Sequence, residues 1–204
     1  MNTRFNNNTS AKILLYSANY GEIFLLTQKL DWDGIAEIIC SAAKKLETAG
    51  ADCLLLCANT MHIVADRVKA VVNIPLIHIA DVVIEEIQRE MLSRVLLLGT
   101  KYTMAATFYS APLKQLGIDT IVPSKDEIEI INSSIYNELG KGIFLPATKI
   151  IYVDMIERFR LQGAEGVILG CTEIPMLIKQ RDCVLPLLDT TQLHAVAAVD
   201  FALG

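Results

Sequence analysis

The chain has 204 residues, of which 52% are hydrophobic and 20% are charged, and its formal net charge at pH 7 is −5. The apolar residues occur in runs well short of the roughly 18 needed to span a bilayer, and the polar start of the chain lacks the apolar core of a signal peptide. Its 18 basic residues are scattered rather than clustered, so we expect a cytoplasmic protein that binds neither membranes nor nucleic acid.

The first half of the chain alternates short apolar runs with helical patterns. One helix is expected between an Asp31 cap and Gly50, because apolar residues recur at helical spacing from Trp32 to Leu46. Further helices are expected at 62–71 and 81–91. Strands are expected at 13–16, 53–56, 76–77 and 94–98.

The second half of the chain repeats this rhythm. Helices are expected at 107–116, 126–139, 146–161 and 191–203, and strands at 118–121, 166–169 and 184–187. Strands that alternate with helices favour an α/β fold, with a mostly parallel sheet that is buried on both faces.

A repeated phrase indicates an internal duplication. A Gly-Ala-acid sequence occurs at 50–52 and at 163–165, and each copy leads through apolar residues to a cysteine, Cys57 or Cys171. We therefore predict two similar lobes. The first lobe comprises 1–92 with 188–204 and carries Cys57, and the second comprises 93–187 and carries Cys171.

The cysteines do not form a recognisable disulfide or metal motif. Their number, five, is odd, and without an export signal we expect no disulfide. If 52–57 is a strand, the sulfurs of Cys53 and Cys57 lie roughly 13 Å apart, too far to bind one metal ion. The three histidines are not clustered either, so no metal site is predicted. Cys40 and Cys53 fit the pattern of ordinary core residues.

Cys57 and Cys171 both stand where a buried strand runs into polar residues. In open α/β sheets, ligands bind beyond the carboxyl ends of the strands. Main-chain N–H groups near a helix start there can bind a carboxylate and lower the pKa of a neighbouring thiol. Racemisation needs a base on one face of the α-carbon and an acid on the other, with the roles reversed for the other enantiomer. Two equivalent thiols therefore favour a racemase, although either cysteine could simply be a core residue.

The motifs around these cysteines resemble those of the aspartate/glutamate racemase family, and most closely its bacterial aspartate racemase branch. The two most specific stretches are Cys57-Ala58-Asn59-Thr60-Met61-His62 and Gly170-Cys171-Thr172-Glu173. Further matching stretches lie at 11–17, 77–81, 98–100, 163–169 and 188–191, so the resemblance spans nearly the whole chain.

The resemblance implies two α/β lobes with the active site between them, a homodimer, and no pyridoxal phosphate or other cofactor. It places the catalytic thiols at Cys57 and Cys171. Aspartate is the expected substrate, with glutamate or a broader set as alternatives. The resemblance implies that four residues bind the substrate carboxylates: Asn59, Thr60, Thr100 and Thr172. It also implies that Glu173 and His194 orient or tune the thiols. Candidates for the substrate side-chain carboxylate are Lys12, Lys101 and Lys141.

The sequence departs from the family pattern at its start. Family members usually have a strand, a Gly-rich loop and a helix before the segment that matches Lys12 to Tyr16. We expect this unit to be missing here, and we expect a chain expressed as written to be poorly soluble or inactive. The corresponding alternative function is that of a truncated, catalytically impaired family member that only binds a small ligand.

Other reactions remain as alternatives. The same scaffold serves hydantoin racemases, decarboxylases and maleate isomerases, but decarboxylation needs only one thiol, so the cysteine pair favours racemisation. A cysteine hydrolase would pair Cys57 with His62 or His194, yet the sequence has no nucleophile-elbow motif. His62 and His78 are better interpreted as packing residues.

Overall fold

The structure is a computed structural model that describes residues 10–204, and it divides them into two compact units. The helical unit comprises 10–56, Met61–His78 and Ala195–Gly204, and the sheet unit comprises Cys57–Thr60 and Ile79–His194. The expectations about the first nine residues lie outside this description. The two predicted lobes have different boundaries from these units, and the lobe arrangement stays a prediction.

The sheet unit is built on one parallel sheet of four strands. These are β1 (Arg94–Gly99), β2 (Asp119–Ile121), β3 (Gly166–Gly170) and β4 (Leu187–Asp189), in the order β2-β1-β3-β4. The predicted parallel sheet is confirmed. The last strand begins three residues later than predicted, because Val184 is exposed and Pro186, which has no N–H to donate, precedes the paired residues.

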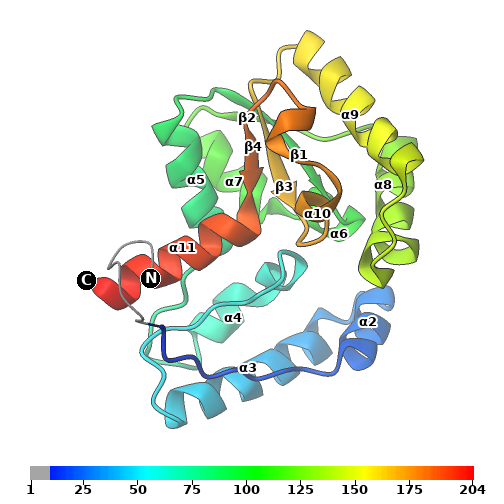
Figure 1. Cartoon of the computed structure of the whole chain (residues 1–204). Coiled ribbons are helices and arrows are strands. Elements are labelled where there is room, and N and C mark those ends of the chain that lie inside the picture. Colours follow the sequence, from blue (N-terminus) through cyan, green and yellow to red (C-terminus); the bar gives the residue numbers. More distant parts are fainter. Residues whose placement is uncertain (1–9) are drawn as a thin grey trace. The chain divides into compact units, whose positions relative to one another are not determined.

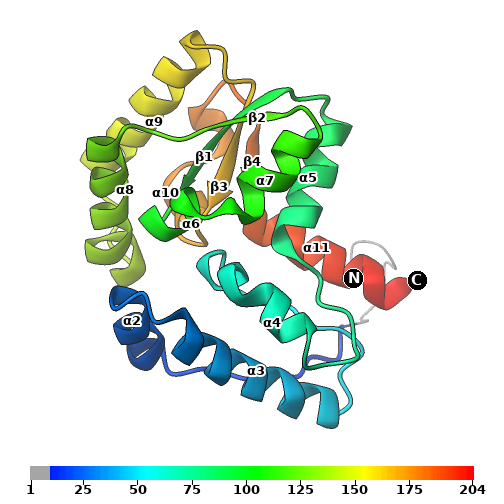
Figure 2. The same ribbon diagram turned by 180° about the vertical axis from the view of Figure 1, so that it is seen from behind.

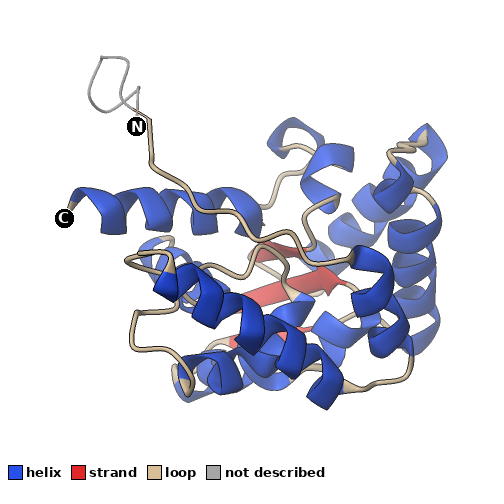
Figure 3. Cartoon of the chain, turned by 90° about the horizontal axis from the view of Figure 1, so that it is seen from below, coloured by secondary structure: helices blue, strands red, loops and turns tan. Residues whose placement is uncertain are grey.

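Helices cover both faces of this sheet. Figures 1 and 2 show α5 (Ile79–Arg89) and α7 (Thr107–Gln115) on one side, and α8 (Lys125–Asn137) and α9 (Pro146–Leu161) on the other. Figure 3 shows the strands in red among these helices. Two short helices that the sequence did not predict, α6 (Lys101–Ala105) and α10 (Ile174–Leu177), follow β1 and β3.

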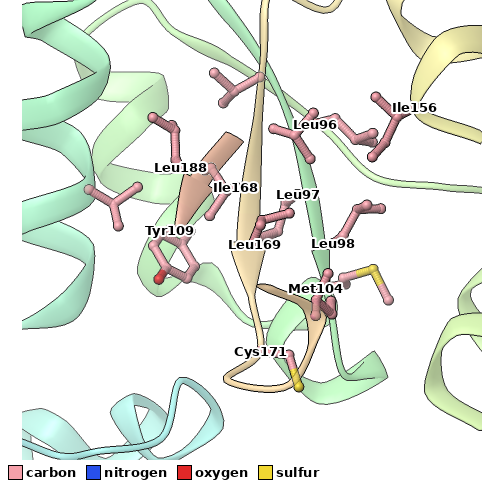
Figure 4. Packing of buried hydrophobic residues seen from close by; sticks show 14 of the residues in the cluster. Leu96, Leu97, Leu98, Met104, Tyr109, Ile156, Ile168, Leu169, Cys171 and Leu188 are labelled. Carbon is pink, nitrogen blue, oxygen red and sulfur yellow. The ribbon is translucent and has the colours of Figure 1, made fainter. Parts of the chain in front are cut away.

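The core of the sheet unit lies on both sides of the central strands. The side chains of β1 and β3 from Val95 to Leu98 and from Val167 to Leu169 are almost fully buried. In Figure 4, Tyr109 and Leu188 lie on one side of β3, and Leu98 and Met104 lie on the other. Continuous apolar runs are what a parallel strand needs when helices cover both of its faces.

The helical unit contains α2 (Tyr20–Gln28), α3 (Trp32–Thr48), α4 (Ala65–Lys69) and the later part of α11 (Thr190–Leu203). Helix α3 confirms its prediction, since the Asp31 carboxylate accepts a hydrogen bond from the N–H of Gly34 at 2.9 Å. A 3₁₀ turn, η1 (Thr60–Val64), precedes α4 where a single helix at 62–71 was predicted. The first turn of α11 belongs to the sheet unit.

The strands predicted at 53–56 and 76–77 form only one isolated β bridge. Within the described residues of the helical unit, the only β pairing is an isolated parallel bridge between Leu54 and Leu76. The N–H of Leu54 donates to Pro75, and the N–H of Ile77 donates back to Leu54. The apolar runs at 53–56 and 76–77 therefore meet as predicted, but they do not extend into a sheet.

The predicted strand at 13–16 is wrong for the described structure. This segment has no regular secondary structure, and the side chains of Ile13 and Leu15 are 79% and 82% exposed. A short apolar run forms a strand only where a neighbouring strand offers hydrogen-bonding partners. No strand in the described part of the chain pairs with 13–16.

Within residues 10–204, the helices are too short or too polar to cross a membrane.

Candidate active site

Two glycines end the central strands of the sheet unit. Gly99 of β1 pairs with Gly170 of β3, and a Cβ atom on Gly99 would lie 2.7 Å from the carbonyl oxygen of Gly170. Only glycine allows the two strands to end this close together. The residues that follow are Thr100 and Cys171, so both leave the sheet at the carboxyl edge, where α/β proteins bind ligands.

Cys171 is buried directly beyond β3, and Figure 4 shows its sulfur pointing away from the sheet. The thiol donates a hydrogen bond to Oε2 of Glu173 at 2.9 Å, and the Thr172 hydroxyl donates to the same oxygen at 2.7 Å. Burial raises the pKa of Cys171, and the charge and hydrogen bond of Glu173 raise it further. The lowered thiol pKa expected from the sequence is thus wrong for Cys171 in this state. Its thiol is protonated at neutral pH and can act as an acid.

The segment 57–60 belongs to the sheet unit, although its chain neighbours on both sides belong to the helical unit. Cys57 is exposed. The hydroxyl of Thr60 lies 2.9 Å from that of Thr100 and 3.0 Å from that of Thr103. Thr100 and Thr103 are 3.1 Å apart, which closes a triangle of three hydroxyls. This threonine triangle fixes the end of the Cys57 turn beside the end of β1.

Asn59 carries the second attachment of this turn. Its side-chain amide donates to the hydroxyl of Thr190 at 3.0 Å and accepts from the hydroxyl of Tyr109 at 2.6 Å. Thr190 in turn donates to the carbonyl oxygen of Leu169 at 2.8 Å. We call these three hydrogen bonds the Asn59 relay. The relay joins the turn that carries Cys57 to the strand that leads to Cys171.

Sequence reasoning missed three members of these networks, namely Thr103, Tyr109 and Thr190. Thr103 follows the Thr100 cap by three residues, and its N–H donates to the Thr100 hydroxyl at 3.2 Å, which is an ordinary helix-start spacing. Thr190 lies in a stretch that carries the family resemblance, but its partner is 131 residues away. Nothing in the sequence around Tyr109 distinguishes it from a core aromatic residue.

The remaining predicted residues occupy varied positions. His194 is buried one helical turn after Thr190 in α11, so the two share a helix face. His62 is buried with its ring edge-on to His78, at 4.6 Å between ring centroids, as suits a packing residue.

The three candidate lysines are all on or near the surface. Lys101 lies 3.8 Å from a carboxylate oxygen of Glu129, and Lys12 and Lys141 are exposed. Their assignment to the substrate side-chain carboxylate stays a prediction.

All five cysteines are free thiols. Among residues 10–204, no group of three or more His, Cys, Asp or Glu side chains is arranged to hold a metal ion.

Comparison with known proteins decides the family. Residues 8–198 match the profile of the Asp/Glu/Hydantoin racemase family. The chain belongs to this family. A crystal structure of a candidate Asp/Glu racemase from Yersinia pestis is 40% identical, with a TM-score of 0.91 over 100% of this chain and 89% of that chain. An aspartate racemase homologue from Pyrococcus horikoshii OT3 is 39% identical, with a TM-score of 0.86 over 99% of this chain and 88% of that one.

A further relative extends the comparison. The broad specificity amino-acid racemase RacX of Bacillus subtilis (strain 168) is 24% identical over 176 residues, which are 86% of this chain and 76% of RacX. The family resemblance drawn from the two cysteine turns is confirmed, and the four-stranded parallel sheet flanked by helices matches the racemase-family structures.

Proposed function

We propose that this racemase-family protein interconverts the enantiomers of an amino acid by two-base proton transfer, with Cys57 and Cys171 as the acid and base. The observation that supports this best is the Asn59 relay. Through Thr190, it ties the turn of the first thiol to the strand that ends at the second. Both thiols thus belong to turns of the same compact unit.

In this reaction one cysteine, as thiolate, removes the proton from the α-carbon. The other cysteine, as thiol, donates its proton to the opposite face of the carbanion and becomes the thiolate. The reverse direction exchanges the two roles, so no net proton or electron is gained or lost. Cys171 is protonated in the described state, which suits it to act first as the acid.

Glu173 sets the acidity of Cys171. Its carboxylate accepts the hydrogen bond of the Cys171 thiol and raises the pKa of that thiol. Cys171 becomes a base by giving its proton to the carbanion, and its thiolate is then ready for the reverse direction. The role of Glu173 in tuning Cys171 is therefore part of the proposal. His194, buried near the start of α11, keeps its proposed role of orienting the site.

The side-chain and backbone groups of Thr60, Thr100 and Thr172 are the proposed donors to the substrate carboxylates. They come from the Cys57 turn, the end of β1 and the Cys171 turn. Aspartate is the first substrate to test, followed by glutamate and a wider panel. The relative RacX, named for its broad specificity, is the reason for including the panel. We also propose a homodimer, which light scattering would show as twice the mass of one chain.

The test is to incubate the purified chain with each enantiomer of aspartate in D₂O. Proton NMR should show loss of the α-proton signal, and chiral chromatography should show the opposite enantiomer appearing. The same assay is then run across the panel of other amino acids. Binding of these amino acids with neither exchange nor interconversion would overturn the racemase proposal and favour a ligand-binding protein.

A further inference from the structure

Three buried side chains of the Asn59 relay have defined hydrogen-bond directions. Tyr109 and Thr190 are fully buried and Asn59 is 4% exposed. The phenol hydroxyl donates to Oδ1 of Asn59, which leaves Nδ2 to donate to Thr190. Because an amide has an acceptor end and a donor end, these two partners fix which way round the Asn59 side chain lies.

The two ends of the relay differ in how the chain around them is held. Leu169, where it ends, is held in β3 by pairing with Leu98 of β1 and Asp189 of β4. Residues 57–59, by contrast, lie in no helix or strand. The position of this turn therefore depends on the side chains that hold it, whereas the sheet does not depend on the turn.

Tyr109 is suited to hold the turn. It projects from α7 into the core, so the packing of its ring fixes where the hydroxyl lies. Burial raises the pKa of Tyr109, although hydrogen bonding to Thr190 lowers it in part, so the hydroxyl keeps its proton and remains a donor. Both ends of the Asn59 amide thus bond to protein partners, one N–H to Thr190 and the oxygen to Tyr109.

We propose that Tyr109 is a positioning residue for Cys57, which it holds in place through Asn59, with Thr190 as the second anchor. This inference rests on the proposed function for its meaning in catalysis. It also adds a role for Asn59 to the one expected from the family resemblance, namely orienting the turn that carries the thiol.

The test is Tyr109→Phe, which removes only the hydroxyl and keeps the ring in the core. Tyr152→Phe is the matched control, because Tyr152 is also fully buried and its hydroxyl bonds to Ser134, at 2.9 Å, rather than to the relay. Both variants therefore lose one buried phenol hydrogen bond. A general loss of stability would appear in both, whereas loss of positioning would appear only in Tyr109→Phe.

The first measurement is amide hydrogen exchange followed by mass spectrometry, which needs no enzyme activity. In Tyr109→Phe, peptides that cover 57–60 should exchange about tenfold faster, while peptides of β1 and β3 remain as in the parent protein. In Tyr152→Phe, the 57–60 peptides should be unchanged. Unchanged protection at 57–60 in Tyr109→Phe, or equal deprotection of every peptide, would overturn the proposal.

The second measurement separates the two thiols. Cys57→Ala and Cys171→Ala identify which enantiomer loses its α-proton to which thiol. Tyr109→Phe should then lower kcat for the Cys57-dependent exchange by about tenfold or more, because small misplacements of a reacting group are costly. The Cys171-dependent exchange and KM should change much less, and equal losses for both enantiomers would contradict the inference. If the parent protein exchanges neither enantiomer, the proposed function fails, and the hydrogen-exchange result alone decides the role of Tyr109.

Discussion

Each thiol is expected to be indispensable for interconversion but not for every proton transfer. Cys57→Ala or Cys171→Ala should lower racemisation by about 10²- to 10⁴-fold, the usual contribution of one general acid or base. Each variant should retain deuterium exchange for the enantiomer whose base is still present. Chiral chromatography and NMR measure the two activities separately. Cys40→Ala is the control, because Cys40 is partly buried and packs against a core cluster of the helical unit. Full racemisation by Cys171→Ala would disprove the two-base assignment.

Glu173 should control the acidity of Cys171. Because burial and the neighbouring carboxylate both raise the pKa of this thiol, Glu173→Gln removes one of the two causes and should lower it. More thiolate should then be present at a given pH, so alkylation of Cys171 by iodoacetamide should become faster. Peptide mass spectrometry across a pH series gives the rate at this residue. Glu165→Gln, a carboxylate bound to Ser93, should leave the rate unchanged, and slower alkylation in Glu173→Gln would contradict the argument.

Single residues show how far the sequence could predict this site. Cys57 and Cys171 were predicted from a local signal, polar residues that follow an apolar run, and Thr60 was predicted from the family resemblance. Tyr109 could not be found in this way, because its role depends on an amide 50 residues earlier in the chain. Hydrogen bonds between residues far apart in the chain produce no periodic pattern in the sequence. The two cysteine turns could therefore be predicted, but the buried side chains that hydrogen-bond to them could not.

The end of helix α5 contains a strained residue. Met91 has a φ of 55°, and the N–H groups of Met91 and Leu92 donate to Gln88 and Ile87, the pattern of a Schellman cap. A side chain in this left-handed conformation costs roughly 1–2 kcal/mol. Met91→Gly should therefore raise the free energy of unfolding by about 1 kcal/mol, as measured by urea denaturation.

The reciprocal change tests the same physics at another helix end. Gly117 follows α7 with a φ of 75°, and a Cβ there would meet no atom within 4 Å. Gly117→Ala should therefore lower stability through backbone strain alone, by about 1 kcal/mol. If Met91→Gly and Gly117→Ala changed the free energy of unfolding in the same direction, the left-handed conformation would not be what determines stability at these positions.

Helix α8 is expected to contribute a pH-dependent part of the stability. Glu127 accepts hydrogen bonds from the N–H and hydroxyl of Ser124 and pairs with Arg158. Burial acts to raise the pKa of Glu127, but the bonds from Ser124 and the charge of Arg158 outweigh it, so the pKa is lowered. This contribution is complete above the unfolded pKa of about 4.3 and is lost as the pH falls through the folded pKa.

Glutamine keeps an oxygen that can accept from Ser124, so Glu127→Gln removes only the charge. It should destabilise the protein by roughly 0.3–1 kcal/mol near neutral pH and by much less at about pH 3.5. Urea unfolding at the two pH values measures this difference. Glu129→Gln serves as the control, because its carboxylate lies 3.8 Å from Lys101 and takes no part in the cap. An equal loss at both pH values would show that the charge of Glu127 does not stabilise the helix.

Strands were predictable only where the chain also supplied their neighbours. The apolar runs at 94–98 and 166–169 became central strands because they pair with each other and with β2 and β4. The runs at 13–16 and 53–56 have similar composition, yet one is unpaired within the described residues and the other forms a single bridge. Hydropathy indicates that a segment can be a strand, whereas hydrogen-bonding partners decide whether it becomes one.

The whole protein is expected to need no cofactor. The proposed chemistry uses thiols and one carboxylate, so activity should survive dialysis against a chelator under reducing conditions and treatment with hydroxylamine, which would remove pyridoxal phosphate. Iodoacetamide should abolish activity, with substrate giving protection. Loss of activity to the chelator, restored by adding back a divalent metal ion, would contradict this expectation.

The separation of Asn59 from its partner has a consequence for the nascent chain. Thr190 is made 131 residues after Asn59. At about 5–20 residues per second, translation takes roughly 7 to 26 seconds to cover that interval. During this time the turn that carries Cys57 lacks its hydrogen bond to Thr190. A chain released just before residue 190 therefore contains both cysteines, but it lacks the hydrogen bond between Asn59 and Thr190 that joins their turns.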